Sequence, residues 1–312
     1  MTKVVFLGVS SDVPKIAVLA RERTGDIEVL LPGDAGAEEA EVAVCWAPPP
    51  GALAAYPRLR LIHAIAAGVD NILCDPHLPA LPLCRVVAPD LTVAMTEFII
   101  WGVLYYHRDL DRALANQRNM IWNRTPPAAA SSCSVGIMGV GQLGAHVAGE
   151  LLRMGFKVRG WSRQEKTVDG MQSFHGESLS DPQFWDFLGG TDILVCLLPL
   201  TAQTQGILNR ATLTALPAGA ALIHVGRGGH LVSAEVQAML ENGHLRGAIL
   251  DVFEKEPLPV ESPFWSMSNV IVTPHIAAAA SYDSVLDQIE ENIRRLQQGE
   301  PLRNLVDRGS GY

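Results

Sequence analysis

Short apolar runs alternate with helical stretches through the second half of the chain, and this alternation restricts the fold more than any other feature. Each run is short and apolar on both faces, which is typical of strands in a parallel sheet covered by helices. The runs are CSVGIMG, FKVRGW and residues 192–198, 220–225, 246–252 and 269–274. They predict a doubly wound, Rossmann-type α/β sheet.

The first ninety residues repeat the pattern, with prolines between the runs. Runs at 4–9, 42–47, 59–65 and 84–88 predict a second parallel sheet, in a flavodoxin-like domain. Because 312 residues are many for one hydrophobic core, two domains are expected. The fold class is therefore α/β, with the Rossmann-type sheet inserted in the flavodoxin-like domain.

The expected boundaries follow from this arrangement. The flavodoxin-like domain is expected over residues 1–97 and the inserted domain over 98–284. A final amphipathic helix ends at Gly299 and Pro301. Residues 285–312 are expected to return to the first domain.

A long helical stretch, with a break, is expected from Asp90 to Trp122. Its first half contains FIIWGVL at 98–104, which is apolar on all sides, a pattern that indicates burial at a domain or subunit boundary. This pattern predicts a homodimer, with Trp122 packed at the interface. The segment RTPPAAASS at 124–132 is expected to be a linker.

Charge and cysteine usage exclude several classes of protein. A formal net charge of -9 argues against nucleic acid or an anionic membrane as the main partner. No apolar run reaches transmembrane length, and VVFLGV is too short for the core of a signal peptide. The cysteines at 45, 74, 84, 133 and 196 form no CxxC pair, which favours reduced thiols over disulfides or a zinc site. We therefore expect a soluble, cytoplasmic protein without a metal ion.

Three glycines between an expected strand and an expected helix predict a dinucleotide site. Gly139, Gly141 and Gly144 have the G-x-G-x-x-G spacing. The first glycine permits the tight turn, the second lets the backbone approach a pyrophosphate, and the third lets helix and strand pack closely. The free N–H groups of the helix would then bind the phosphates.

The next strand ends without the acidic residue that normally binds the ribose diol. Ser162 and Arg163 occupy that position, and Lys166 follows. A hydroxyl and a guanidinium would bind a 2′-phosphate through charge-assisted hydrogen bonds, so the pattern favours NADP(H). The alternative is a solvated surface arginine beside a degenerate site.

A series of motifs resembles the D-2-hydroxyacid dehydrogenase family, and within it the glyoxylate/hydroxypyruvate reductase branch. After the glycine loop come LLPLTAQTQGILN, GRGG, DVFEKEPLP, TPHIAAA and the tail VDRGSGY. The first ninety residues match mainly through AAGVDNI. The resemblance implies that the first domain binds substrate and the inserted domain binds the dinucleotide.

The resemblance also implies three catalytic residues. Arg227 would hold the carboxylate and ketone oxygen of a 2-oxo acid, which a guanidinium fork fits. His275 would act as the general acid that protonates the ketone oxygen. Glu256 would hydrogen-bond to His275 and favour its protonated form. Taken singly, each could instead be a surface or structural residue, and His275 could merely cap a helix.

Further contacts are carried over from the family in the same way. Asp251 would bind the nicotinamide carboxamide. The backbone amides of Gly68 and Val69 would bind the substrate carboxylate, and Trp46 would line the substrate pocket. The remaining expected cofactor contacts are Gln142, Leu143, Pro199, Thr204 and Val225.

The activity implied is NADPH-dependent reduction of a small 2-oxo acid, glyoxylate or hydroxypyruvate, to the D-2-hydroxy acid. A bulkier substrate such as phenylpyruvate, oxidation of another D-hydroxy acid, formate or phosphite, and a non-catalytic NADP(H)-sensing scaffold are alternatives. One departure concerns His224, which stands where relatives often have Asn and puts the local hydrogen bonding in doubt. His224 and His230 both lie near Arg227 in the sequence.

Overall fold

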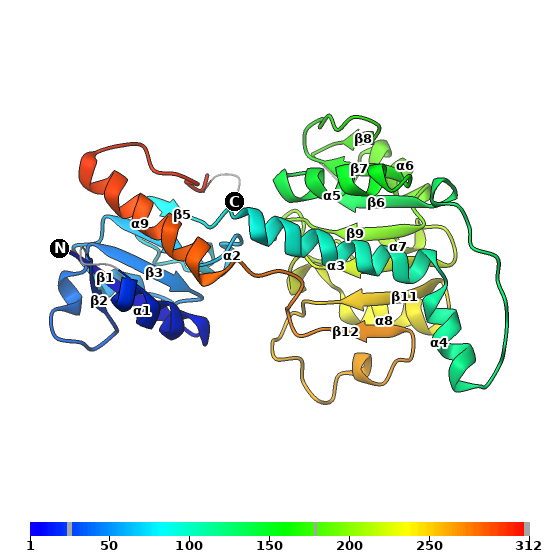
Figure 1. Ribbon diagram of the computed structural model, residues 1–312, viewed down its shortest axis with the longest axis horizontal. Coiled ribbons are helices and arrows are strands. Elements are labelled where there is room, and N and C mark those ends of the chain that lie inside the picture. Colours follow the sequence, from blue (N-terminus) through cyan, green and yellow to red (C-terminus); the bar gives the residue numbers. More distant parts are fainter. Residues whose placement is uncertain (24–26, 178–179, 309–312) are drawn as a thin grey trace. The chain divides into compact units, whose positions relative to one another are not determined.

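The computed structural model describes residues 1–23, 27–177 and 180–308, and it divides the chain into two compact units (Figure 1). Unit 1 comprises Met1–Leu91 and Ala279–Tyr312, and unit 2 comprises Thr92–Ala278. The chain passes between the units after residues 91 and 278, whereas the expected boundaries follow residues 97 and 284, six residues later in each case. The first crossing falls inside a continuous helix, so no change in sequence pattern marks it. The last four residues of the tail VDRGSGY lie outside the described residues.

Unit 1 contains a five-stranded parallel sheet in the order β2-β1-β3-β4-β5, which is the flavodoxin-like order. Its strands are β1 (Thr2–Gly8), β2 (Ile27–Leu30), β3 (Val42–Trp46), β4 (Leu61–Ala64) and β5 (Leu83–Cys84). Its helices are α1 (Asp12–Arg23), the short α2 (Asp70–Leu73) and α9 (Tyr282–Gln298). Gly299 ends α9 in the left-handed conformation (φ 69°), as expected for a C-terminal glycine.

Unit 2 contains a seven-stranded parallel sheet in the order β12-β11-β10-β9-β6-β7-β8. Its strands are β6 (Ser134–Met138), β7 (Lys157–Ser162), β8 (Gln172–His175), β9 (Ile193–Cys196), β10 (Ala220–His224), β11 (Leu245–Leu250) and β12 (Val270–Val272). Its helices are α3 (Pro89–His107), α4 (Leu110–Arg118), α5 (Gln142–Arg153), α6 (Pro182–Gly189), α7 (Arg210–Thr214) and α8 (Ser233–Glu241). The strand order reverses between β6 and β9, the switch point where doubly wound sheets bind ligands.

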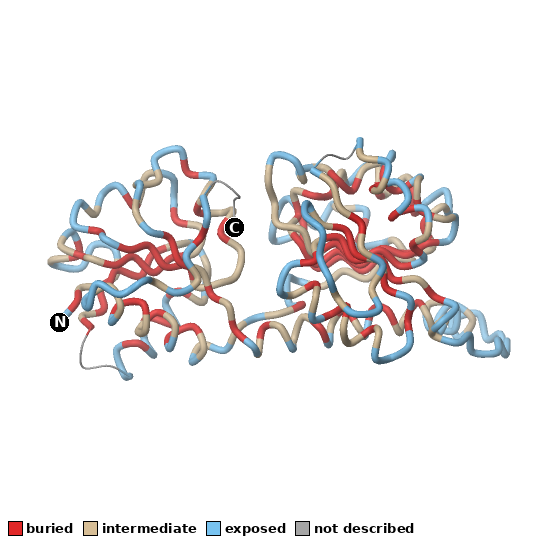
Figure 2. The backbone as a smooth tube through the Cα atoms, turned by 90° about the horizontal axis from the view of Figure 1, so that it is seen from above, coloured by how far each residue is buried: buried red, intermediate tan, exposed pale blue. Residues whose placement is uncertain are grey.

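Successive residues of the unit 2 strands enter two separate cores, because side chains alternate across a sheet. Ile223 joins the core that contains Ile99 and Val103 of α3. Leu222 joins the opposite core with Phe184 and Phe187 of α6. The central strands of each sheet are accordingly the most continuously buried segments (Figure 2). Burial on both faces explains their unbroken apolar sequences.

Helix α3 crosses the sheet of unit 2, and α4 extends beyond its edge (Figure 1). A Cβ at Gly102 would lie 2.9 Å from Ile223 Cδ1, so glycine allows α3 to pack tightly on β10. The expected break occurs at Asp109, whose φ of 55° interrupts the helix. Among the described residues, none of the helices has the length and apolarity needed to cross a membrane.

Candidate functional site

Three loops at one edge of the unit 2 sheet carry the residues that the sequence singles out. Arg227 lies three residues after β10, Asp251 directly follows β11, and His275 lies three residues after β12. These strands are adjacent and parallel, so their carboxyl ends lie at the same edge of the sheet. In α/β folds this edge is where ligands bind.

His275 and Glu256 form a hydrogen-bonded pair. His275 Nδ1 lies 2.8 Å from Glu256 Oε2, and the two side chains are 39% and 36% exposed. The Phe253 amide donates to Glu256 Oε1 at 2.9 Å and fixes the carboxylate plane. This arrangement leaves Nε2 as the histidine nitrogen that can transfer a proton to a bound molecule.

The pKa of Glu256 lies below its ordinary value of 4.5. Burial alone would raise this pKa, but the hydrogen bonds from His275 and Phe253 and the charges of His275 and Arg227 outweigh it. The influence of Arg227 on Glu256 indicates that the three side chains share one electrostatic environment. They can hold an anion and a proton donor together.

Glu256→Gln is expected to lower the melting temperature most near neutral pH. A carboxylate whose pKa is lowered by folding contributes stability above its unfolded value, and that contribution disappears as pH falls through the folded value. The difference between wild type and Glu256→Gln should therefore shrink below about pH 4.5. Thermal melts from pH 3 to 8 measure this, with Glu254→Gln as the neighbouring exposed control. A pH-independent difference would contradict the ion pair.

Asp251 organises the loop that carries His275. Its side chain is 2% exposed. Thr273 Oγ1 and the Ile276 amide donate to Asp251 Oδ1 at 2.6 and 2.8 Å, and the Ala277 amide donates to Oδ2 at 3.0 Å. The His275 amide also donates to the Asp251 carbonyl at 2.9 Å. These bonds hold His275 in the left-handed region, with φ of 55°, which is uncommon for a residue other than glycine.

The glycines of GRGG permit close approaches around Arg227. A Cβ at Gly228 would lie 1.9 Å from the carbonyl carbon of Phe253, so this position must be glycine for the Arg227 and Glu256 loops to meet. A Cβ at Gly226 would lie 2.9 Å from His230 Nδ1. The Arg227 guanidinium donates through Nη1 to the Gly226 carbonyl at 2.9 Å. The motif therefore packs the arginine loop against its neighbours.

The glycine loop between β6 and α5 has the geometry of a pyrophosphate cradle. Gly139 has φ of 105°, and a Cβ there would lie 2.8 Å from the Leu197 carbonyl oxygen. A Cβ at Gly144 would lie 2.0 Å from the Gly139 carbonyl oxygen, whereas at Gly141 it would meet no described atom within 4 Å. The space at Gly141 and the unbonded first amides of α5 fit a dinucleotide phosphate. Gln142 and Leu143 lie in this first turn.

Ser162, Arg163 and Lys166 lie at and beyond the end of β7, the strand next to β6. Arg163 and Lys166 are exposed. Ser162 Oγ donates to the Gln164 carbonyl at 2.7 Å, which shapes the turn and leaves the hydroxyl oxygen able to accept a hydrogen bond. This turn presents two cations and a hydroxyl at the expected adenosine ribose position.

The loop after β9 carries Pro199 and Thr204. Thr204 Oγ1 donates to the Pro199 carbonyl at 2.7 Å. Val225, directly after β10, is buried and its amide donates to the Cys196 carbonyl at 3.3 Å. These residues lie at the carboxyl ends of the two strands that follow the switch point.

Trp46, Gly68 and Val69 belong to unit 1 and lie at the carboxyl ends of its strands. Trp46 ends β3, next to Gly8 at the end of β1. Gly68 and Val69 follow β4 and precede α2. Within the described parts of the chain, neither of their amides donates a hydrogen bond. Two adjacent available amides suit a carboxylate.

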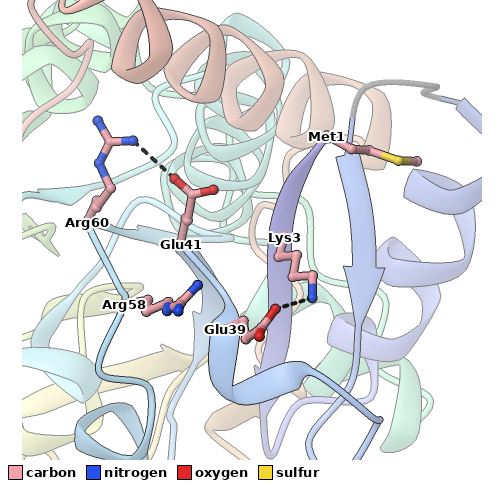
Figure 3. Close-up of a pocket in the computed structure, with 6 residues that line it drawn as sticks. All are labelled: Met1, Lys3, Glu39, Glu41, Arg58 and Arg60. Carbon is pink, nitrogen blue, oxygen red and sulfur yellow. Dashed lines mark hydrogen bonds and ion pairs between the residues drawn. The ribbon is translucent and has the colours of Figure 1, made fainter.

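A charged hollow lies at the opposite, amino-terminal edge of the unit 1 sheet (Figure 3). It has a volume of about 460 Å³. Lys3 pairs with Glu39 at 2.5 Å, and Arg60 pairs with Glu41 at 3.1 Å. Because it lies open at the surface and both of its acidic side chains are paired with basic ones, we assign it no ligand.

Comparison with known proteins decides the family. The sequence profile of the D-isomer specific 2-hydroxyacid dehydrogenase, NAD binding domain, matches residues 100–277. A glyoxylate/hydroxypyruvate reductase A from Salmonella newport (strain SL254) is 40% identical over 279 residues, 88% of each chain. The chain belongs to the D-isomer specific 2-hydroxyacid dehydrogenase family. The resemblance inferred from the motifs is thus confirmed.

Solved structures of the same dehydrogenase family have the same fold. One, from Xanthobacter autotrophicus Py2 in complex with NADPH and MES, is 38% identical, with a TM-score of 0.91 and coverage of 100% of this chain and 99% of that chain. An NADPH-dependent glyoxylate/hydroxypyruvate reductase from Sinorhizobium meliloti, in complex with NADP and sulfate, is 36% identical, with a TM-score of 0.90 and complete coverage of both chains. The predicted α/β fold class is confirmed.

Proposed function

We propose that the protein reduces a small 2-oxo acid to the D-2-hydroxy acid with NADPH, with glyoxylate and hydroxypyruvate as substrates. The observation that carries this proposal is the His275–Glu256 pair at 2.8 Å, under the electrostatic influence of Arg227, at the carboxyl edge of a dinucleotide-binding sheet. The relatives named glyoxylate/hydroxypyruvate reductase support the same reaction. The solved structures in complex with NADP or NADPH support the cofactor.

NADPH supplies the hydride when bound. The residues that would hold it are those of the glycine loop and first turn of α5, the Ser162–Lys166 turn, and Pro199, Thr204, Val225 and Asp251. In this proposal Asp251 has two tasks, because its carboxylate already accepts three hydrogen bonds from its own chain. A carboxylate has about four acceptor sites, so one further donor, such as a carboxamide, can be accepted.

Each substrate-binding residue would supply one interaction. Arg227 would bind the carboxylate and ketone oxygen of the 2-oxo acid and stabilise the charge that develops on that oxygen. His275 would donate its Nε2 proton to the oxygen, while Glu256 holds Nδ1 and stabilises the charged ring. The available amides of Gly68 and Val69 would bind the carboxylate, and Trp46 would line the pocket.

The direct test follows NADPH absorbance with a panel of 2-oxo acids. We expect turnover with glyoxylate and hydroxypyruvate and little with phenylpyruvate. Higher kcat/KM for phenylpyruvate would move the assignment to a bulkier substrate. NADPH binding without turnover of any acid would support a sensing scaffold instead and would defeat the proposal.

Arg163→Asp is expected to raise the KM for NADPH without lowering kcat/KM for NADH. The substitution removes a cation from the 2′-phosphate and adds a repelling charge. The KM for NADPH should therefore rise roughly 10- to 100-fold or more. Lys157→Asp, at the exposed start of the same strand, controls for the change in charge. Equal cofactor preference in wild type and Arg163→Asp would remove the 2′-phosphate assignment.

A homodimer is the proposed assembly. Helix α4 has no buried residue, and Met120 and Trp122 after it are 94% and 98% exposed. Trp101 on α3 is also 42% exposed. The exposed apolar side chains on α3 and after α4 are expected to be covered by a second copy of the chain. Light scattering should give twice the mass of the chain and a lower mass for Trp122→Asp; a monomeric wild type would contradict the proposal.

A cytoplasmic location is proposed from the cysteines. All five are free thiols, and four of them are buried. Thiol counting with an alkylating reagent on protein freshly released from cells tests this inference, because oxidised thiols would indicate another compartment.

A further inference from the structure

Two buried histidines hold the peptide groups of Arg227 from both sides. His224 Nε2 lies 2.9 Å from the Arg227 carbonyl oxygen, and the Arg227 amide donates to His230 Nδ1 at 3.1 Å. Both histidines are completely buried. Their rings meet edge to face, with centroids 5.7 Å apart. The backbone of the arginine is therefore fixed by two side chains that reach no solvent.

The partners fix the proton positions on both rings. A carbonyl only accepts, so His224 carries its proton on Nε2, and burial lowers its pKa to about 3, which keeps the ring neutral. An amide only donates, so His230 accepts at Nδ1 and carries its proton on Nε2. That proton is donated to the Pro199 carbonyl at 3.2 Å. His230 thus links the arginine loop to the loop after β9.

The same histidines lie near Cys196, with ligating atoms of the three residues within 4.8 Å of one another. Both nitrogens of His230 are already engaged with peptide groups, and its Nδ1 receives the Arg227 amide. A metal ion at this place would displace that amide. The His224 Nδ1 atom has no hydrogen-bond partner in the described structure, as expected when Nε2 is reserved for the Arg227 carbonyl. The cluster is organised as a hydrogen-bond network around Arg227.

We propose that His230 is a positioning residue for 2-oxo acid binding. Its Nδ1 sets the orientation of the Arg227 peptide, and its Nε2 couples that peptide to Pro199 in the expected cofactor loop. The inference rests on the proposed role of Arg227 as the substrate-binding arginine. The tight contact of Gly226 against the His230 ring supports it, because that glycine leaves room for this ring beneath the loop.

Two conservative variants distinguish the roles of Nδ1 and Nε2 of His230. The amide oxygen of His230→Asn can take the place of Nδ1 and accept from the Arg227 amide, but this side chain is too short to reach Pro199. The amide NH₂ of His230→Gln can take the place of Nε2 and donate to Pro199, but it leaves the Arg227 amide without an acceptor. We expect His230→Asn to keep the KM for glyoxylate within about threefold and His230→Gln to raise it about tenfold or more.

NADPH binding and thermal melts are measured on the same proteins. We expect the Kd for NADPH to rise more in His230→Asn than in His230→Gln, the reverse of the order for KM. If either His230 variant does not fold, His224→Gln and His224→Leu replace the pair, because only Gln can donate to the Arg227 carbonyl. In that pair the KM for glyoxylate should rise only in the Leu variant.

The outcomes distinguish this inference from the function on which it rests. If both variants change the KM for glyoxylate equally, and in proportion to their loss of melting temperature, His230 is a stabilising core residue. That result would overturn the inference about His230 but not the proposed function. An unchanged KM and kcat in Arg227→Lys would overturn the role of Arg227 and the inference with it.

Discussion

His275→Asn is expected to lower kcat for glyoxylate reduction by about 10²- to 10⁴-fold, the usual contribution of a positioned proton donor. An asparagine amide can donate a hydrogen bond but cannot release a proton. Asparagine also tolerates the left-handed conformation that His275 adopts, with φ of 55°. The loss therefore reports proton transfer rather than a distorted loop. Steady-state kinetics over a range of glyoxylate concentrations measure it.

The controls for His275→Asn separate chemistry from binding. The Kd for NADPH should change little, and the melting temperature should fall no further than in Glu256→Gln, because the Asp251 bonds to the loop involve backbone amides and Thr273. His275→Ala should lose as much kcat. Turnover near the wild-type rate in either variant would remove His275 from the chemistry.

Arg227→Met is expected to lower kcat/KM for glyoxylate by roughly 10²- to 10⁴-fold, the sum of about two charge-assisted hydrogen bonds. Arg227→Lys keeps the charge but loses the planar fork, so about 10- to 100-fold is expected. Because the arginine would bind both ground state and transition state, KM should rise as kcat falls.

A matched substitution controls for loss of an arginine elsewhere in unit 2. Among the described residues, Arg153, near the end of α5, pairs with the partly exposed Glu150, and Arg153→Met should leave kcat/KM unchanged. If Arg227→Met and Arg153→Met behaved alike, the substrate would have to be bound by other groups.

The sequence predicted the strands that are buried on both faces and missed those with weaker patterns. β2 and β8 lie at sheet edges and were not anticipated. Gln172–His175 of β8 contains one buried residue, so a strand paired on one side leaves little apolar signal. The predicted first boundary at residue 97 and the division after Leu91 both fall within α3, which runs continuously through this region.

The motifs predict where the glycine loop and the Arg227, Glu256 and His275 side chains lie relative to the strands, and the structure has them at strand ends, while their chemical tasks stay predictions. The contacts that support these residues could not be predicted from the sequence. Nothing in the spacing of Asp251 indicates that its side chain clamps the His275 loop. The role of His224 depends on a bond to the Arg227 carbonyl that only the folded loop creates. Such contacts are tertiary, and local sequence does not encode them.

One isotope experiment tests the central claim most directly. Hydroxypyruvate is reduced with NADPH carrying two deuterium atoms at C4 of the nicotinamide, and the product is analysed by mass spectrometry and chiral chromatography. Direct hydride transfer, with the proton from His275, predicts D-glycerate with one deuterium at C2. Unlabelled product, the L enantiomer, or no glycerate would contradict the proposed reaction.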